Sequence, residues 1–292
     1  METMMTIGEL KKFAARIRLE TVGCIGSRGF GHIGGALSVV EALAVLYGGV
    51  MRIDPKQPDW PDRDKLVMSK GHAGPALYAA LALKGYFPLD LLKTLNRPGT
   101  TLPSHCDRNL TPGIDMTTGS LGQGVSAAIG LALAQRMDGR NSRTYLITGD
   151  GELNEGQAWE GALFAPQQKL ANLVWLVDYN RKQLDGSTEE IIDLGDLGAK
   201  FTAFGWHTLS VNGNEVEALS RALEEAGRER EKPVCLILHT TKGAGIPAVE
   251  AIELNHHLVF EGELYEQSRT YMEQVLGELE SQYPGEANGG KA

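Results

Sequence analysis

Cysteine is scarce in this chain of 292 residues, which contains Cys24, Cys106 and Cys235 at scattered positions. No two of them form a CxxC pair. The spacing therefore indicates neither a disulfide framework nor a zinc site. This usage is typical of the reducing cytoplasm, which is the location we expect.

Positive charge and long apolar segments are also lacking. The chain has 28 Lys and Arg against 37 Asp and Glu, a net charge of −9, which disfavours nucleic acid because its phosphates require clustered basic residues. The opening METMMTIGELKKFAAR lacks the apolar region of a signal peptide. We find no apolar run approaching the ~18 residues of a membrane span. We therefore expect no nucleic-acid partner and no membrane partner.

Apolar runs alternate with helical patterns along the chain, whose composition is 42% hydrophobic and 22% charged. Such alternation predicts an α/β fold with a parallel sheet flanked by helices. No internal repeat or linker divides the chain. We expect one domain over residues 1–283 and a disordered polar tail, PGEANGGKA, over residues 284–292.

The centre of the chain reads as strand, helix, strand. The run 145–148 ends in Gly149-Asp150-Gly151, and the run 173–177 ends in Asp178-Tyr179-Asn180. In a βαβ unit both polar ends emerge at the carboxyl edge of a parallel sheet, where such sheets bind ligands.

The residue types at this edge suit a magnesium diphosphate. Asp150 offers a carboxylate oxygen and Asn180 an amide oxygen, and a backbone carbonyl just after Asn180 adds a third. Few hard oxygen ligands, completed by phosphate and water, suit Mg²⁺. Gly149 and Gly151 allow backbone N–H groups to approach a diphosphate, and we expect a helix after Gly151 to point its N-terminus at that anion. Taken alone, Asp-Gly is also a common turn dipeptide.

Gly-Asp-Gly followed about thirty residues later by the strand-ending Asn180 resembles the thiamine diphosphate-binding signature, and GDGELNEGQAWEGALFA is similar to transketolases. The resemblance implies a metal site, holding Mg²⁺ or Ca²⁺ or Mn²⁺ in its place, formed by Asp150, Asn180 and the Lys182 carbonyl. It also places Glu155 in a carboxylate network between paired cofactor sites. The other interpretation of Glu155, a glutamate favoured by the dipole in the first turn of a helix, is compatible with that role.

The segment GSRGFGHIGGAL contains His32 among glycines. Gly29 to Gly34 match GxGxxG by letter, but they follow a helix and not a strand, so we reject a dinucleotide site. The segment resembles the glycine-flanked histidine loop of transketolases, which implies that His32 contacts the substrate and aids proton movement. A solvent-facing loop histidine is the alternative.

Three further histidines lie in segments that resemble the same family. His72 follows a strand within residues 62–69 and opens a helix, either beside the cofactor or only as a cap partner. His105 lies in LPSH, which is similar to a P-G-H segment. His256 follows KGAG and adjoins His257, which leaves two registers open. Because neighbours on an extended segment point apart, we do not expect these two to bind a metal together.

The segment TTGSLGQG at residues 117–124 resembles the stretch that contacts both rings of the cofactor. Leu121 is either an apolar wedge in the site or a core leucine. The resemblance implies cofactor contacts from Gly35, His72, Gly119, Ser120, Leu121, Asp150, Gly151, Glu155, Asn180, Lys242 and His256. It implies catalytic roles for His32, His72, His105 and His256.

The resemblance covers nearly all of the chain and implies transfer of a two-carbon ketol unit from a ketose to an aldose. It implies a fold of the diphosphate-binding type and a separate partner chain, which carries the pyrimidine-binding domain and a catalytic glutamate, in an α2β2 assembly acting on sugars or sugar phosphates. The alternatives are a 2-oxoacid dehydrogenase α subunit, a deoxyxylulose phosphate synthase or a non-catalytic cofactor-binding subunit.

Overall fold

The computed structural model describes residues 4–284, so most of the tail predicted to be disordered lies outside the described residues. Five strands form one sheet in the order β2-β3-β4-β6-β5, and every neighbouring pair is parallel. The strands are β2 Lys65–Met68, β3 Thr144–Gly149, β4 Leu173–Tyr179, β5 His207–Asn212 and β6 Val234–His239. The predicted α/β fold is confirmed.

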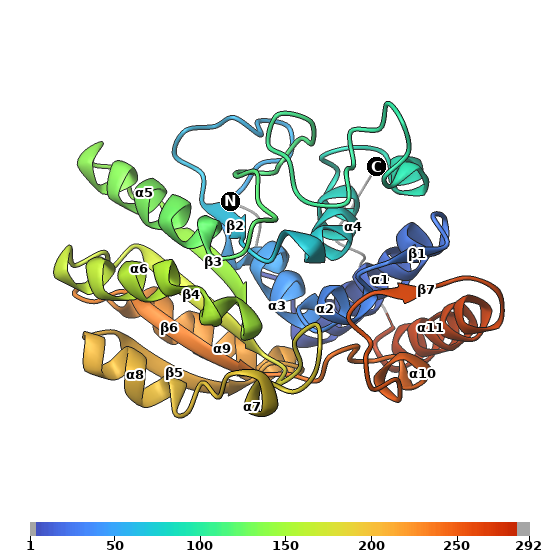
Figure 1. Ribbon diagram of the computed structural model, residues 1–292. Coiled ribbons are helices and arrows are strands. Elements are labelled where there is room, and N and C mark those ends of the chain that lie inside the picture. The colour runs from blue at the N-terminus through green and yellow to red at the C-terminus, as the bar shows by residue number, and fades with distance from the viewer. Residues whose placement is uncertain (1–3, 285–292) are drawn as a thin grey trace.

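Helices cover both faces of this sheet (Figure 1). One face carries α5 Gln123–Met137, α6 Gly156–Gln167 and α8 Leu197–Phe204. The other face and its flank carry α1 Ile7–Gly26, α3 Val40–Val45, α4 Gly74–Lys84, α9 Val216–Arg228 and α11 Gly262–Gln282. Successive strand residues point to opposite faces; Leu146 packs in the core on the α5 side and Ile147 in the core on the α1 side.

Shorter elements connect these layers. They are α2 Ile33–Leu37, α7 Thr188–Ile191, α10 Pro247–Glu250, the 3₁₀ helices Gly71–Ala73, Leu89–Thr94 and Gly151–Asn154, and the π-turn Leu46–Val50. A separate antiparallel pair, β1 Phe30–Gly31 and β7 Leu258–Val259, joins the early and late histidine segments. This two-stranded ribbon brings together the segments of His32 and His256, which are far apart in the sequence.

The stretch Ile33–Val50 corrects the expectation that no apolar segment approaches the ~18 residues of a membrane span. It spans 18 residues with a mean hydropathy of 1.7, long and apolar enough to cross a membrane by length and composition. Yet 89% of it is buried inside the protein, and it is broken into α2, α3 and the π-turn, where Gly49 adopts φ 133°. Its apolar composition is explained by the core that it forms with α1 and α4.

Candidate active site

The carboxyl edge of the sheet holds a cavity of about 150 Å³ between the ends of β3, β4 and β6. The register pairs Gly149 with Asp178, so the two polar strand ends predicted to meet do lie side by side. The lining residues include predicted site residues from seven separate segments: Gly35, His72, Leu121, Asp150, Gly151, Asn180, Lys182, Lys242 and His256.

Asp150 is 2% exposed at this edge. Its Oδ1 accepts a hydrogen bond from the Gly151 N–H at 2.8 Å and its Oδ2 accepts one from the Arg181 N–H at 2.5 Å. Burial and the nearby Asp178 carboxylate raise the pKa of Asp150 to about 7. A divalent cation beside it would therefore relieve an unfavourable buried charge, and a carboxylate has lone pairs left for such a contact.

The other two oxygens of the predicted metal set lie on the loop after β4. Asn180 Oδ1 accepts from the Lys182 N–H at 3.0 Å, and the Lys182 carbonyl accepts from Lys242 Nζ at 2.7 Å. Burial lowers the pKa of Lys242 to about 8. Within residues 4–284 no three His, Cys, Asp or Glu side chains form a metal-binding group. One acidic ligand with neutral oxygens fits Mg²⁺ brought by a diphosphate better than a metal held by protein alone.

A buried ion pair beneath this loop was missed by the sequence analysis. Asp178 is fully buried and accepts from Lys70 Nζ at 2.6 Å, from Ser38 Oγ at 2.7 Å, and also from the Thr240 hydroxyl. Burial raises the pKa of Asp178, but Lys70 and the hydroxyl donors outweigh it and the net shift is downward. Asp178 Oδ2 also accepts from Asn180 Nδ2 at 2.8 Å, which assigns the amide orientation and turns Asn180 Oδ1 away from Asp178.

Glu152 is a second residue that the sequence analysis missed. It is 1% exposed, and its Oε1 accepts from the Ser69 hydroxyl and from the Gly122 N–H at 2.8 Å, while its Oε2 accepts from the Gly149 N–H at 3.2 Å. One carboxylate thus joins the ends of β2 and β3 to the TTGSLGQG segment. Burial raises the pKa of Glu152, although all of these donors favour its charged form.

We expect Glu152→Gln to weaken thiamine diphosphate binding about tenfold, within the range for groups that orient direct ligands. The amide oxygen still accepts from Ser69 and Gly122, but its NH₂ group meets the Gly149 N–H, which leaves a buried donor unpaired. Calorimetric titration in the presence of Mg²⁺ measures this change, and Glu160→Gln, an exposed glutamate on α6, is the control. Equal affinity in both variants would contradict a role for Glu152.

The residues after Gly151 differ from the predicted helix. A four-residue 3₁₀ helix and a bend at Glu155 precede α6, which begins at Gly156. A helical segment thus follows Gly151, as expected, but it opens with a 3₁₀ turn and the long helix begins five residues later. That its N-terminus points at a diphosphate stays a prediction. Glu155 is exposed and occupies the cap position of α6 without a side-chain capping hydrogen bond. Its predicted place in a carboxylate network stays a prediction.

The TTGSLGQG segment lies along one side of the cavity. Gly119 adopts φ 144°, which favours glycine, and a Cβ placed there would make a tight contact of 3.1 Å with His105 Cδ2. Ser120 is exposed, and Leu121 is 36% exposed and lines the cavity. The alternative of a core leucine is therefore wrong.

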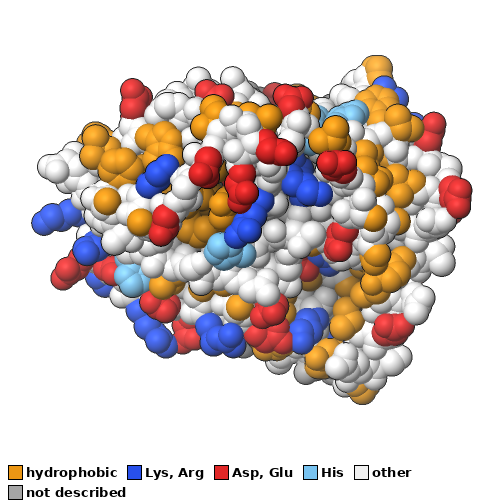
Figure 2. All heavy atoms as spheres, turned by 60° about the horizontal axis from the view of Figure 1, so that its bottom comes forward, with side chains coloured by type: hydrophobic (Ala, Val, Ile, Leu, Met, Phe, Trp, Pro, Cys, Tyr) orange, Lys and Arg blue, Asp and Glu red, His pale blue; other side chains and the backbone are white. Residues whose placement is uncertain are grey.

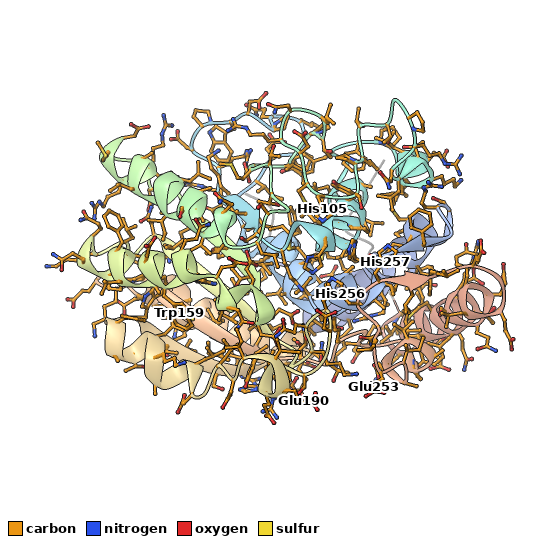
Figure 3. All side chains as sticks on the ribbon, in the orientation of Figure 1. His105, Trp159, Glu190, Glu253, His256 and His257 are labelled. Atoms are coloured by element: carbon orange, nitrogen blue, oxygen red, sulfur yellow. The ribbon has the colours of Figure 1, made fainter. Side chains whose placement is uncertain are left out.

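His32 forms the centre of a histidine cluster. Its ring centroid lies 5.4 Å from that of His72, 5.5 Å from His105, 5.2 Å from His256 and 4.8 Å from His257. Figure 3 shows His105 above His256 and His257, two neighbours on the segment that leads into β7. A solvent-facing loop histidine does not describe this position.

Two expectations about this cluster are wrong. His32 precedes helix α2, so Gly34 and Gly35 are helical and not part of an irregular loop. His256 and His257 do not point apart, because both rings contact His32. Only His256 also lies 4.8 Å from His72 and lines the cavity, whereas His257 contacts Phe30. This geometry favours the register with His256 in the site.

The four histidines with predicted catalytic roles are neutral at pH 7. Burial lowers the pKa of His32 to about 4 and that of His256 to about 3, helped by neighbouring histidines and Lys242. Burial also lowers the pKa of His72 and of His105. Neutral imidazoles can both donate and accept a proton in a hydrogen bond. His256 Nδ1 is buried and has no hydrogen-bond partner among the described residues.

Comparison with known proteins places this chain in a family. Residues 10–271 match the family described as "Transketolase, thiamine diphosphate binding domain". The chain is 52% identical over 257 residues to the 6-deoxy-6-sulfo-D-fructose transketolase subunit SqwG of Clostridium sp. strain MSTE9, covering 88% of this chain and 94% of that protein. It is 41% identical over 255 residues to an apulose-4-phosphate transketolase subunit from Phocaeicola vulgatus, covering 87% and 90%.

Solved structures agree with these relatives. The transketolase of Campylobacter jejuni superposes with a TM-score of 0.85 at 31% identity, over 93% of this chain and 43% of that chain. The chain thus spans less than half of the Campylobacter jejuni transketolase, but nearly all of the Clostridium and Phocaeicola subunits. These matches do not favour the other thiamine enzymes or a non-catalytic subunit. The chain belongs to the transketolase family and corresponds to the thiamine diphosphate-binding, amino-terminal half of those enzymes.

Proposed function

We propose that this chain is the amino-terminal subunit of a two-subunit transketolase, using thiamine diphosphate and Mg²⁺. The observation that carries the proposal is the meeting, at one sheet edge, of hard oxygen ligands with a cluster of neutral histidines. The first suits a metal diphosphate and the second suits the hydroxyls and carbonyl of a sugar.

In this proposal Asp150, Asn180 and the Lys182 carbonyl hold the metal. The bond from Lys242 Nζ keeps the Lys182 carbonyl in place, and a carbonyl oxygen has a second lone pair for the ion. Lys70 also lines the cavity, where its ammonium group is paired with the Asp178 carboxylate at 2.6 Å. Gly119, Ser120 and Leu121 would contact the rings of the cofactor. When bound, thiamine diphosphate supplies the stabilised carbanion that carries the two-carbon unit.

The histidines hold and move protons on the sugar oxygens. His32 lies at the centre, with the centroids of the four surrounding rings 4.8–5.5 Å from its own, so a bound sugar would contact several imidazoles at once. A neutral ring can donate to a carbonyl oxygen and accept from a hydroxyl without a change in net charge. His256, with its unpaired Nδ1, is the ring best placed to meet both cofactor and substrate.

A partner chain is proposed to complete the site. The cavity of about 150 Å³ is smaller than the roughly 300–1,000 Å³ of typical ligand pockets, so this chain supplies only part of its walls. The names of the two relatives, which describe each as a subunit, support the same arrangement. We propose an α2β2 complex in the cytoplasm, with the catalytic glutamate and pyrimidine-binding domain on the partner.

The sugar is proposed to carry an anionic group. One relative is named for a sulfo sugar and another for a sugar phosphate. A donor panel containing 6-deoxy-6-sulfo-D-fructose, apulose 4-phosphate and a neutral ketose separates these specificities. Equal rates with the neutral ketose would argue against recognition of the anion.

Reconstitution tests the proposed function. We expect the purified chain alone to transfer no ketol unit from any donor, and to gain activity when mixed with the carboxyl-half chain encoded beside it. Mass measurement should then give two copies of each chain. A full rate from this chain alone would overturn the two-subunit proposal and would require a catalytic glutamate within these residues.

A further inference from the structure

A second cavity lies at the opposite, amino-terminal edge of the sheet. Its volume is about 340 Å³, and it opens where α5, α6 and α9 end and where β3 and β4 begin. Figure 2 shows Lys and Arg side chains along the left margin, the side where α5, α6 and α8 lie in Figure 1. The volume falls within the range of roughly 300–1,000 Å³ that is typical of small-molecule sites.

Five cationic side chains line this cavity in a chain whose net charge is −9. They are Arg136, Arg140, Arg143, Lys169 and Arg230. Within residues 4–284, Arg140 is the one of these that pairs with carboxylates, those of Asp62 and Asp138. The other four concentrate positive charge that no acidic side chain neutralises by direct contact.

The helix ends around the cavity do not cancel this charge. Each helix C-terminus contributes about half a negative charge, and Glu229 contributes one more at the rim. Glu229 Oε1 is turned back on its own loop, where it accepts from the N–H groups of Arg230 and Glu231 at 2.8 and 2.7 Å. Asp64 lies close to Arg143 as well, since it accepts from the Arg143 N–H at 2.7 Å. The four cations without a carboxylate on their side chains still exceed the roughly −3.5 charges of three helix ends, Glu229 and Asp64.

Hydrogen bonds to backbone carbonyls hold two of the arginine side chains in place. Arg143 donates to the carbonyls of Ala226 and Gly227 at 3.2 and 2.9 Å, and Arg136 donates to the Gln168 carbonyl. Lys169 adopts φ 50°, an unfavourable conformation for a residue with a side chain. Capping of helix ends explains the two arginines, and it also explains the backbone of Lys169, whose N–H donates to the Pro166 carbonyl at 2.9 Å while the Leu170 N–H donates to that of Ala165 at 3.2 Å. This cap fixes the place of Lys169 at the cavity but leaves its ammonium group free of a carboxylate partner in the described part of the chain.

Ser142 points independently to a ligand. It is 2% exposed, it lines the cavity, and its Oγ is buried without a hydrogen-bond partner among the described residues. A buried hydroxyl without a partner costs about 1–3 kcal/mol. An anion in the cavity could accept a hydrogen bond from this hydroxyl while it contacts the cations.

We propose that this cavity binds a phosphate group, either as inorganic phosphate or as the phosphate of a monoester. Arginine and lysine side chains with a hydroxyl donor are the groups that recognise such tetrahedral oxyanions. The site is separate from the active site, since it lies at the other end of the same strands and shares no lining residue with that cavity.

Calorimetric titration with inorganic phosphate and with glycerol 3-phosphate tests the proposal. The protein is kept at saturating thiamine diphosphate and Mg²⁺ and at constant ionic strength, so that the active site does not compete. We expect saturable binding that weakens about tenfold or more in Arg136→Gln/Lys169→Gln, because charged hydrogen bonds are lost. Tighter binding of glycerol 3-phosphate than of phosphate would identify a monoester as the ligand class.

The control is Lys93→Gln/Arg269→Gln, which removes the same charge from exposed sites on other elements. It should bind phosphate like the unmodified chain. Ser142→Ala, which removes a single hydroxyl, should also weaken binding and covers the case in which the double variant folds poorly. Ketol transfer by the reconstituted enzyme should continue in all of them. No saturable binding, or equal binding by the double variant and the control, would overturn the proposal.

Discussion

Replacing Asp150 with asparagine is expected to weaken Mg²⁺-dependent binding of thiamine diphosphate by about 100-fold or more, since even groups that merely orient a metal ligand contribute 10–100-fold. Asp150 is the one acidic group of the proposed set, and the other two ligands are neutral oxygens. Asparagine keeps the size and one oxygen of the side chain but removes the charge that faces the ion.

Asparagine is preferred to alanine because of where Asp150 lies. The side chain lies at the sheet edge but is 2% exposed, and it accepts from the N–H groups of Gly151 and Arg181. Alanine would leave both donors unpaired at a cost of about 1–3 kcal/mol each, and so would mix lost binding with lost stability.

Calorimetric titration of the reconstituted complex, with and without Mg²⁺, measures the change in cofactor affinity. Asp193→Asn is the matched control, because Asp193 is exposed and accepts from the Gly195 N–H at 2.8 Å. Unchanged cofactor affinity in Asp150→Asn would remove Asp150 from the metal site. A melting temperature close to that of the control would show that the fold is retained.

The parts of the site that could be predicted are those set by regular strand geometry. Polar residues after two consecutive buried strands must emerge at the same edge, and Gly149 and Asp178 are indeed paired in register. The capping box at Thr6 and Glu9 was predictable for a similar reason, since it depends on residues three apart. Local periodicity is enough in both cases.

The parts that could not be predicted depend on partners far apart in the chain. Glu152 reads as an ordinary residue after a turn, and nothing in its spacing shows that it binds Ser69 and Gly122. The Lys70–Asp178 pair joins positions 108 residues apart. The sequence did hold a sign of this pair, because Lys70 follows one buried strand and Asp178 ends another. The carboxyl ends of both strands lie at the same edge of the sheet.

The histidine cluster shows a different limit. The rule that adjacent residues on an extended segment point apart failed for His256 and His257, which precede the two-residue strand β7 and both contact His32. Their placement depends on the ribbon between β1 and β7, which pairs Phe30 with Val259. Two-residue strands carry too little pattern to be recognised in a sequence.

His32→Ala is expected to lower the turnover of the reconstituted enzyme by roughly 10²–10⁴-fold, the usual contribution of a group that transfers a proton in the transition state. Cofactor affinity should change little, because His32 does not line the cavity that contains Asp150 and Asn180. His32→Asn, which keeps a hydrogen-bonding group but cannot relay a proton, should lose nearly as much turnover as the alanine variant.

The pH dependence adds a second test of the same residue. Burial lowers the pKa of His32 to about 4, against an unfolded value near 6.5. The unfolded chain therefore binds more protons between these values, so the stability contributed by neutral His32 is present above pH 6.5 and is lost as pH falls through 4. His32→Asn should lose less stability than the unmodified chain over that interval.

His207→Ala is the control for both measurements, because His207 lies on β5 and pairs with Glu225 at 3.1 Å, outside the cluster. Steady-state rates with a saturating ketose measure turnover separately from substrate affinity. A histidine that only contacts the substrate at the cavity rim would change the affinity and not the turnover. If His32→Ala retains turnover within about twofold of the His207→Ala control, the central ring of the cluster is structural, and proton movement must be assigned to His72, His105 or His256.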